Sequence, residues 1–172
     1  DNYRLEIAFI LTALISLGWL MSVVVGMVFD LFPITHDSDA FTHTHSNQYL
    51  LINIIGQVLI MGGIFSNNLT LMFEMVTVGL VLLTWGLISI AWPSWKLHIE
   101  SKQKGINCGN IALIPALLIP VSSLVVLGCW IFRKETGLLE FGFSFNVVVQ
   151  MGTIALSLIL AHFNLSLIHI SE

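Results

Sequence analysis

Three imidazoles and two carboxylates lie close together near the start of the chain, and side chains of these types bind metal ions. They belong to His36, Asp37, Asp39, His43 and His45. Imidazole nitrogen is a common ligand of zinc, copper, nickel and iron, and carboxylates complete many such sites. Residues 32–48 contain no Lys or Arg that would repel a cation. The segment therefore predicts a metal site, although its spacing matches no fixed motif, and a polar loop that responds to pH is the alternative.

A single acidic residue within an apolar stretch is a second candidate. Glu74 lies just over one turn after Leu69, where a membrane span is expected to begin. Ionisable groups inside membranes are often proton relays or ion ligands, which is the functional interpretation of this carboxylate. The alternative is that Glu74 is near enough to the end of the span to reach water among the lipid headgroups.

Polar side chains form a regular stripe near the end of the chain. Its members are Asn146, Gln150, Thr153 and Ser157. This spacing places them on one face of a helix, and carboxamides in hydrocarbon need hydrogen-bond partners, so the face should point into a helix bundle. The stripe would line a substrate path or supply hydrogen bonds between helices. Asn53 and Gln57, one turn apart on an earlier apolar stretch, are candidate partners.

Small residues recur at every fourth position of the first apolar stretch, at Gly18, Ser22 and Gly26. Such a pattern lets a neighbouring membrane helix approach closely. We therefore expect this face to be buried against another helix and the substitution Gly26→Leu to destabilise the fold. Trp19 lies in the middle of the stretch, away from either membrane interface, so we expect it to pack against protein.

These residues are carried by a chain that is far more apolar than a soluble domain. Of its 172 residues, 56% are hydrophobic and 9% are charged, and the mean hydropathy is +0.93. Soluble domains carry about 25% charged residues, and a domain of this size would expose much of its apolar surface to water. A lipid bilayer is therefore the expected partner. The net charge of −4 and the absence of a basic stripe argue against nucleic-acid binding.

Apolar stretches long enough to cross a hydrocarbon core of ~30 Å predict about five transmembrane helices. They are expected at residues 5–31, 49–65, 69–92, 111–132 and 143–163. The predicted fold class is all-α, a polytopic transmembrane helix bundle that forms a single domain over residues 1–164. Five spans would divide the Lys and Arg residues equally between the two sides of the membrane, so the sequence leaves the orientation open.

The last eight residues, 165–172, resemble the translation of a transposase-end sequencing adapter. On that interpretation the natural sequence stops near Asn164, and the chain is expected to be a fragment of a larger membrane domain. His169 and Glu172 then carry no functional argument. The alternative is that these residues are an ordinary apolar end of the last helix.

One part of the sequence resembles a known family. Gly18-Trp19, Gly26 and Leu31-Phe32-Pro33 precede an apolar run from Tyr49 to Gly56 that contains Asn53. The order of these residues along the chain is similar to that of haem-copper-oxidase large-subunit-like membrane proteins, which include the nitric-oxide-response NnrS type. The resemblance covers about residues 18–63. It implies a respiratory or nitric-oxide-response role in a prokaryotic plasma membrane, with haem or a transition metal as cofactor. The family usually carries histidine shortly before the Gly-Trp pair, where residues 8–13 have none, so ligands would come from the first loop, His162 or sequence outside this fragment.

Three classes of function stay open at this point. The first is an oxidase-large-subunit-like protein that binds haem or a metal, with or without enzyme activity. The second is a transporter or channel that uses Glu74 and the polar stripe. The third is an accessory subunit whose polar faces only hold helices together and whose partners are other membrane subunits. The sequence contains no P-loop, GxGxxG, CxxC, HExxH or GxSxG motif, so no catalytic residue is predicted.

Overall fold

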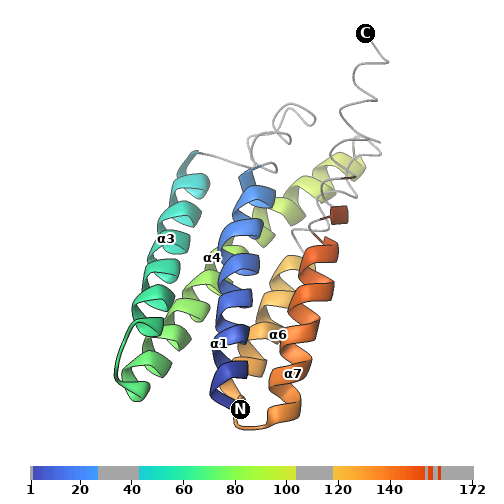
Figure 1. Ribbon diagram of the computed structural model, residues 1–172. Helices are drawn as coiled ribbons and strands as arrows, with labels where there is room; N and C mark the ends of the chain where they lie inside the picture. The colour runs from blue at the N-terminus through green and yellow to red at the C-terminus, as the bar shows by residue number, and fades with distance from the viewer. Residues whose placement is uncertain (1, 27–42, 104–117, 154, 157–158, 160–172) are drawn as a thin grey trace.

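The computed structural model describes residues 2–26, 43–103, 118–153, 155–156 and 159. These residues are almost entirely helical, and there is no strand among them. Figure 1 shows the helices running up and down side by side as a bundle. The predicted all-α helix bundle is therefore confirmed.

Two of the helices contain π-helical segments. The N-terminal helix (residues 2–26) comprises α1 (Asn2–Ala13), the π-helical segment η1 (Leu14–Leu20) and a final stretch of α-helix. Next come α3 (His43–Ile64), α4 (Leu69–Gln103) and α6 (Ile119–Ile131). The C-terminal helix (residues 136–153) comprises α7 (Thr136–Phe145), the π-helical segment η3 (Asn146–Gln150) and three further residues.

A short turn with a side-chain cap makes α3 and α4 antiparallel neighbours. Asn68 Oδ1 accepts hydrogen bonds from the backbone N–H groups of Thr70 at 3.0 Å and Leu71 at 3.4 Å. A helix leaves its first N–H groups without partners inside the helix, and an asparagine at this position satisfies them. The polar triplet Ser66-Asn67-Asn68 therefore ends α3 and allows α4 to begin within a few residues.

Three helices are long and apolar enough to cross a membrane, namely Tyr3–Gly26, His45–Ile64 and Leu69–Lys96. The apolar α6 is shorter. In Figure 1 the N-terminus and the turns at residues 65–68 and 132–135 lie at the same end of the bundle, so successive helices alternate in direction. These helices support a membrane location for the chain.

One predicted boundary is wrong because a proline does not end the helix that contains it. α4 continues through Pro93 to Gln103 instead of stopping at Trp92. Proline removes one backbone hydrogen-bond donor, but membrane helices tolerate this where nearby hydroxyl groups bond to the backbone. Ser94 Oγ donates a hydrogen bond of 2.8 Å to the carbonyl oxygen of Ile90, next to the Ser89 carbonyl that loses its helical donor at Pro93.

Two other helices begin earlier than predicted. α3 begins at His43 instead of residue 49, and the C-terminal helix begins at Thr136 instead of residue 143. The polar first turn of α3 resembles a loop in the sequence, yet it suits a helix start because the N–H groups there have no partner inside the helix. The predicted boundaries at residues 31, 111 and 163 lie outside the described residues.

Two glycines let α3 and α4 come into backbone contact. A Cβ atom added to Gly79 of α4 would lie 2.7 Å from the carbonyl oxygen of Gly56 in α3 and 2.5 Å from the side chain of Ile60. A Cβ atom on Gly56 would lie 3.0 Å from the carbonyl oxygen of Gly79. In lipid, van der Waals packing between small residues drives helix association. These two glycines therefore explain why α3 packs so extensively along α4.

The predicted small-residue face of the N-terminal helix is only partly present. Gly18 is buried, and a Cβ atom there would lie 3.0 Å from Gln57 Cγ. Gly26 is exposed, and no described atom lies within 4 Å of the position of its Cβ, so the prediction for Gly26 is wrong. The physical reason is that each step of four residues advances about 40° beyond a full turn of 3.6 residues. The prediction that Trp19 packs against protein is also wrong, because its side chain is 69% exposed.

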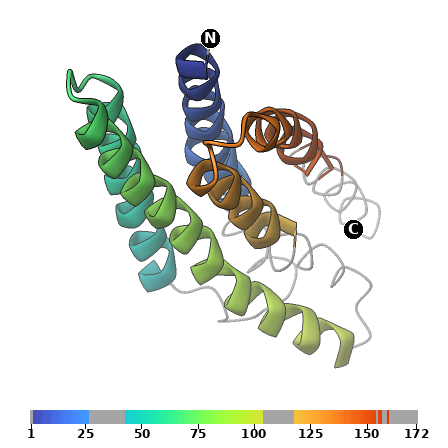
Figure 2. The ribbon, with the colours of Figure 1, turned by 90° about the horizontal axis from the view of Figure 1, so that it is seen from below.

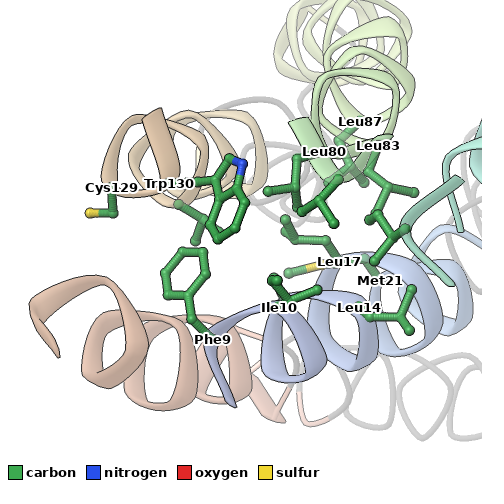
Figure 3. Packing of buried hydrophobic residues seen from close by; sticks show 14 of the residues in the cluster. Phe9, Ile10, Leu14, Leu17, Met21, Leu80, Leu83, Leu87, Cys129 and Trp130 are labelled. Atoms are coloured by element: carbon green, nitrogen blue, oxygen red, sulfur yellow. The ribbon is translucent and has the colours of Figure 1, made fainter. Parts of the chain in front are cut away.

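The apolar core lies between the N-terminal helix, α4 and α6. Figure 2 shows the N-terminal helix between α3 and the C-terminal helix, with α4 and α6 along its other side. Trp130 of α6 is fully buried, with its ring centroid 6.0 Å from that of Phe9 and 5.8 Å from that of Phe73. Figure 3 shows the rings of Phe9 and Trp130 meeting beside leucines of α4.

A polar contact and a cation complete this aromatic cluster. Trp130 Nε1 donates a hydrogen bond of 2.9 Å to Thr77 Oγ1 of α4. The guanidinium of Arg133 lies 3.9 Å from the ring centroid of Phe73 and 4.8 Å from that of Trp130. Trp130 therefore joins the N-terminal helix, α4 and α6 at one end of the bundle.

Candidate functional site

Two groups of hydroxyl and carboxamide side chains lie on either side of the N-terminal helix, one partly buried and one fully buried. The α3 polar cluster consists of Ser22, Tyr49, Asn53 and Gln57. The C-terminal polar cluster consists of Ser16, Ser122, Asn146 and Gln150. In both clusters an asparagine and a glutamine one turn apart share a helix face, and a serine of the N-terminal helix lies beside the asparagine.

In the α3 polar cluster the side chains bond to one another. Asn53 Oδ1 accepts a hydrogen bond from Gln57 Nε2 and lies 3.3 Å from Ser22 Oγ, whose hydrogen is used on the nearer carbonyl oxygen of Gly18. Asn53 Nδ2 donates to the Tyr49 hydroxyl at 3.2 Å, and the hydroxyl oxygens of Tyr49 and Ser22 are 3.3 Å apart. This arrangement fastens α3 to the N-terminal helix, since hydrogen bonds between membrane helices are worth about 1 kcal/mol each.

Replacing Asn53 with leucine is therefore expected to lower the free energy of unfolding by about 1–2 kcal/mol, because Tyr49 and Gln57 lose their shared partner. Unfolding of the purified protein in mixed micelles at increasing denaturing detergent measures this change. Asn67→Leu, the same exchange at an exposed position of the α3–α4 turn, is the control. Equal unfolding midpoints for the two variants would contradict a fastening role for Asn53.

The polar stripe of the C-terminal helix faces the bundle interior over its described part. Asn146 and Gln150 are 0% exposed, and Thr153 is buried. Ser157 lies outside the described residues. Carboxamides therefore sit inside the bundle, where lipid cannot reach them, and must find partners on neighbouring helices.

Those partners are serines that the sequence did not single out. Asn146 Oδ1 accepts a hydrogen bond of 2.7 Å from Ser16 Oγ, and Gln150 Nε2 donates one of 2.7 Å to Ser122 Oγ. The predicted pairing of the stripe with Asn53 and Gln57 is wrong, because the N-terminal helix lies between α3 and the C-terminal helix (Figure 2). A lone serine in an apolar stretch is a weak signal, and only its depth in the bundle distinguishes Ser16 and Ser122 from other serines.

Gln150 keeps one buried atom without a partner. The hydroxyl of Ser122 donates its only hydrogen to the carbonyl oxygen of Ile119 at 2.9 Å. Ser122 Oγ can therefore only accept the hydrogen bond that joins it to Gln150. This fixes the orientation of the carboxamide, with Nε2 towards Ser122. The opposite atom, Oε1, is buried and makes no hydrogen bond. Gln150 therefore presents a free acceptor inside the bundle.

Asn146 keeps a free donor. Ser16 Oγ lies 2.7 Å from Asn146 Oδ1 but 3.3 Å from the carbonyl oxygen of Ala13, so its hydrogen is used on Asn146. Asn146 Nδ2 is buried and has no partner. A buried polar group without a hydrogen bond costs several kcal/mol in an apolar environment. One donor and one acceptor thus remain unpaired one turn apart on the same helix.

Thr84 of α4 provides a third unpaired atom at a similar level of the bundle. Its Oγ1 is buried without a partner, whereas Thr77 on the same helix bonds to the carbonyl oxygen four residues before it. The Thr77–Trp130 hydrogen bond sets the register of α4 against α6. At ~1.5 Å per residue, Thr84 lies about 10 Å along α4 from Thr77, and Ser122 lies about 12 Å along α6 from Trp130. Thr84 and Ser122 are therefore at nearly the same height in the bundle.

Three of the four residues of the C-terminal polar cluster lie in π-helical segments, and Ser122 lies in α6. Ser16 lies in η1, and Asn146 and Gln150 are the first and last residues of η3. In η1 the N–H of Met21 bonds to the carbonyl oxygen of Ser16, five residues earlier. Single π-helical turns are rare and occur frequently at functional sites. The Ser16–Asn146 hydrogen bond joins the two segments.

Glu74 does not belong to either cluster. It lies in the second turn of α4, and its side chain is exposed on the outside of the bundle. The carboxylate therefore lines no path through the described interior. The structure therefore does not bring Glu74 together with the buried residues of the stripe, and a functional role for its carboxylate stays a prediction.

The predicted metal-binding residues are divided between a helix and a segment that the structure does not describe. His43 and His45 belong to the first turn of α3. Their predicted place in a loop is therefore wrong, and positions two apart lie on different sides of a helix. His36, Asp37 and Asp39 lie outside the described residues. Within the described ranges no group of three or more His, Cys, Asp or Glu side chains is placed to hold a metal ion.

The chemistry available in the described interior is hydrogen bonding. Its buried polar side chains are hydroxyls and carboxamides, with no imidazole and no carboxylate among them. Such groups bind neutral polar molecules and do not supply the imidazole that most often ligates haem iron or zinc. The resemblance to haem-copper-oxidase large-subunit-like proteins therefore stays a prediction. The chain matches no protein-family model, and comparisons with curated proteins and with solved structures find no match either.

Proposed function

We propose that this chain is the membrane-embedded part of a transporter or channel that binds a polar solute within its helix bundle. The observation that carries the proposal is the pair of fully buried, unpaired atoms Asn146 Nδ2 and Gln150 Oε1. Polar groups inside membrane bundles mark substrate and ion pathways when they are not used up by one another. Both residues are 0% exposed, so the pair is enclosed by the neighbouring helices.

The contrast between the two polar clusters supports transport over a purely structural role. In the α3 polar cluster, Asn53 uses both ends of its carboxamide on neighbouring side chains. In the C-terminal polar cluster, Asn146 and Gln150 each leave one end unused. A cluster that only holds helices together gains nothing from unpaired carboxamide atoms, each of which costs free energy. A solute that supplies the missing partners recovers that free energy on binding.

Solute flux into proteoliposomes tests the proposal. Liposomes that contain the purified protein are compared with protein-free liposomes for entry of water, urea, glycerol, sodium and chloride. Neutral solutes are followed by stopped-flow light scattering and ions by tracer uptake. Entry of at least one of these solutes well above the protein-free rate is the expected result.

The accessory-subunit alternative makes the opposite prediction. If the reconstituted protein is helical by circular dichroism and none of these solutes enters faster than into protein-free liposomes, the transport proposal fails. The carboxamides would then serve only to hold helices together. Circular dichroism of the same vesicles is the necessary control, because an unfolded protein would also give no flux.

A further inference from the structure

We infer that the C-terminal polar cluster is an occluded binding site for a small neutral molecule that both accepts and donates hydrogen bonds. The inference rests on the proposed function and goes further by naming the residues and the chemical class of the ligand. The two groups that face the ligand are Asn146 Nδ2 and Gln150 Oε1, both unpaired and fully buried. Ser16 and Ser122 position them through the opposite end of each carboxamide.

The two free atoms specify complementary partners. Asn146 Nδ2 carries two N–H donors and calls for an acceptor on the ligand, while Gln150 Oε1 has two lone pairs and calls for a donor. Residues four apart are neighbours on a helix surface, so one molecule can meet both groups. Water, alcohols, urea and simple amides carry a donor and an acceptor within a few atoms of each other.

The same pair excludes charged ligands. A cation would be repelled by the amide hydrogens of Asn146, and an anion by the carbonyl oxygen of Gln150. No charged side chain lies among the buried polar residues of the described helices, so nothing there would compensate an ionic ligand. An uncompensated charge in a medium of low dielectric constant is far more costly than a neutral polar group.

The burial of the site limits the size of its ligand. Both free atoms are buried, so a ligand that binds them is enclosed by the surrounding helices. The adjoining segments η1 and η3 leave the regular α-helical hydrogen-bond pattern where they carry Ser16 and Asn146. A ligand of few atoms is the one that fits between closely packed helices.

Two isosteric substitutions and their matched controls test the inference. Asn146→Leu and Gln150→Met remove the free donor and the free acceptor at nearly constant volume. Asn53→Leu and Gln57→Met make the same exchanges in the α3 polar cluster, where the carboxamides bond to each other. Each variant is measured for urea flux into proteoliposomes, for sodium-22 uptake and for its unfolding midpoint.

A crossed pattern is the expected result. Asn146→Leu and Gln150→Met should lower urea flux at least about tenfold, the effect of losing one hydrogen bond to the ligand, and should leave the unfolding midpoint unchanged or raised. Asn53→Leu and Gln57→Met should lower the midpoint and leave the urea flux per folded protein close to that of the parent. Sodium uptake should equal that of protein-free liposomes throughout.

Other outcomes overturn the inference in distinguishable ways. Urea flux that survives Asn146→Leu and Gln150→Met would show that the solute passes elsewhere, and the proposed function would stand without this site. Sodium uptake that depends on Asn146 would overturn the neutral ligand but keep the site. Lowered midpoints with unchanged flux would assign the cluster a structural role. Absence of flux for every solute in the folded parent would remove the proposed function and the inference together.

Discussion

Replacing Gly79 with leucine is expected to separate α3 from α4 and to lower the free energy of unfolding by about 3 kcal/mol or more. Overpacking usually costs about 1–3 kcal/mol, and this site is at the upper end because the obstacle is backbone. A Cβ atom on Gly79 would lie 2.7 Å from the carbonyl oxygen of Gly56, which cannot turn aside as a flexible side chain can. Unfolding of the purified variant in mixed micelles measures the loss.

The control for this substitution is the same exchange at an open position. Gly26→Leu, which the small-residue pattern marked as disruptive, is expected to leave the unfolding midpoint nearly unchanged, because no described atom lies within 4 Å of a Cβ atom there. Surface substitutions of this kind usually change stability by less than about 0.5 kcal/mol. Similar losses for Gly79→Leu and Gly26→Leu would contradict the packing of α3 on α4 described above.

Trp130→Ala is the second substitution with a large expected effect. The fully buried indole contacts Phe9 and Phe73 and bonds to Thr77, so its removal leaves a cavity at the junction of three helices. Truncation of a buried tryptophan costs about 3–5 kcal/mol. We expect about 3 kcal/mol, at the lower end, because lipid adds no hydrophobic driving force between helices and the loss is one of packing.

Two further tryptophan variants show which property of Trp130 stabilises the fold. One removes its hydrogen bond but keeps an aromatic ring, and the other removes an exposed tryptophan elsewhere. Trp130→Phe keeps most of the ring contacts but loses the bond to Thr77, so a loss of about 1 kcal/mol is expected. Trp92→Ala removes a side chain that is 74% exposed and should leave the unfolding midpoint close to that of the parent protein. Equal effects of Trp130→Ala and Trp92→Ala would show that the aromatic cluster does not stabilise the bundle.

Much of the fold follows from the sequence because lipid permits few alternatives. A chain with 9% charged residues and long apolar runs must satisfy its backbone hydrogen bonds internally, which in the described ranges it does with helices. The same constraint placed the described stripe residues Asn146, Gln150 and Thr153 inside the bundle. Helix ends were less predictable, since Pro93, the polar first turn of α3 and the Thr136-Gly137 start of α7 have the composition of loops but a helical backbone.

What only the tertiary structure decided is which helices meet and how each is rotated. Periodicity defines a helix face but not the helix that packs against it. Ser16 and Ser122 were therefore missed as partners of the stripe, and Asn53 and Gln57 were wrongly predicted to be its partners. The tight contact fell at Gly56 and Gly79, because a four-residue repeat drifts around a helix of 3.6 residues per turn. Whether a carboxamide is fully paired depends on atoms from three helices at once, and for that reason the free ends of Asn146 and Gln150 emerge only when the helices are assembled.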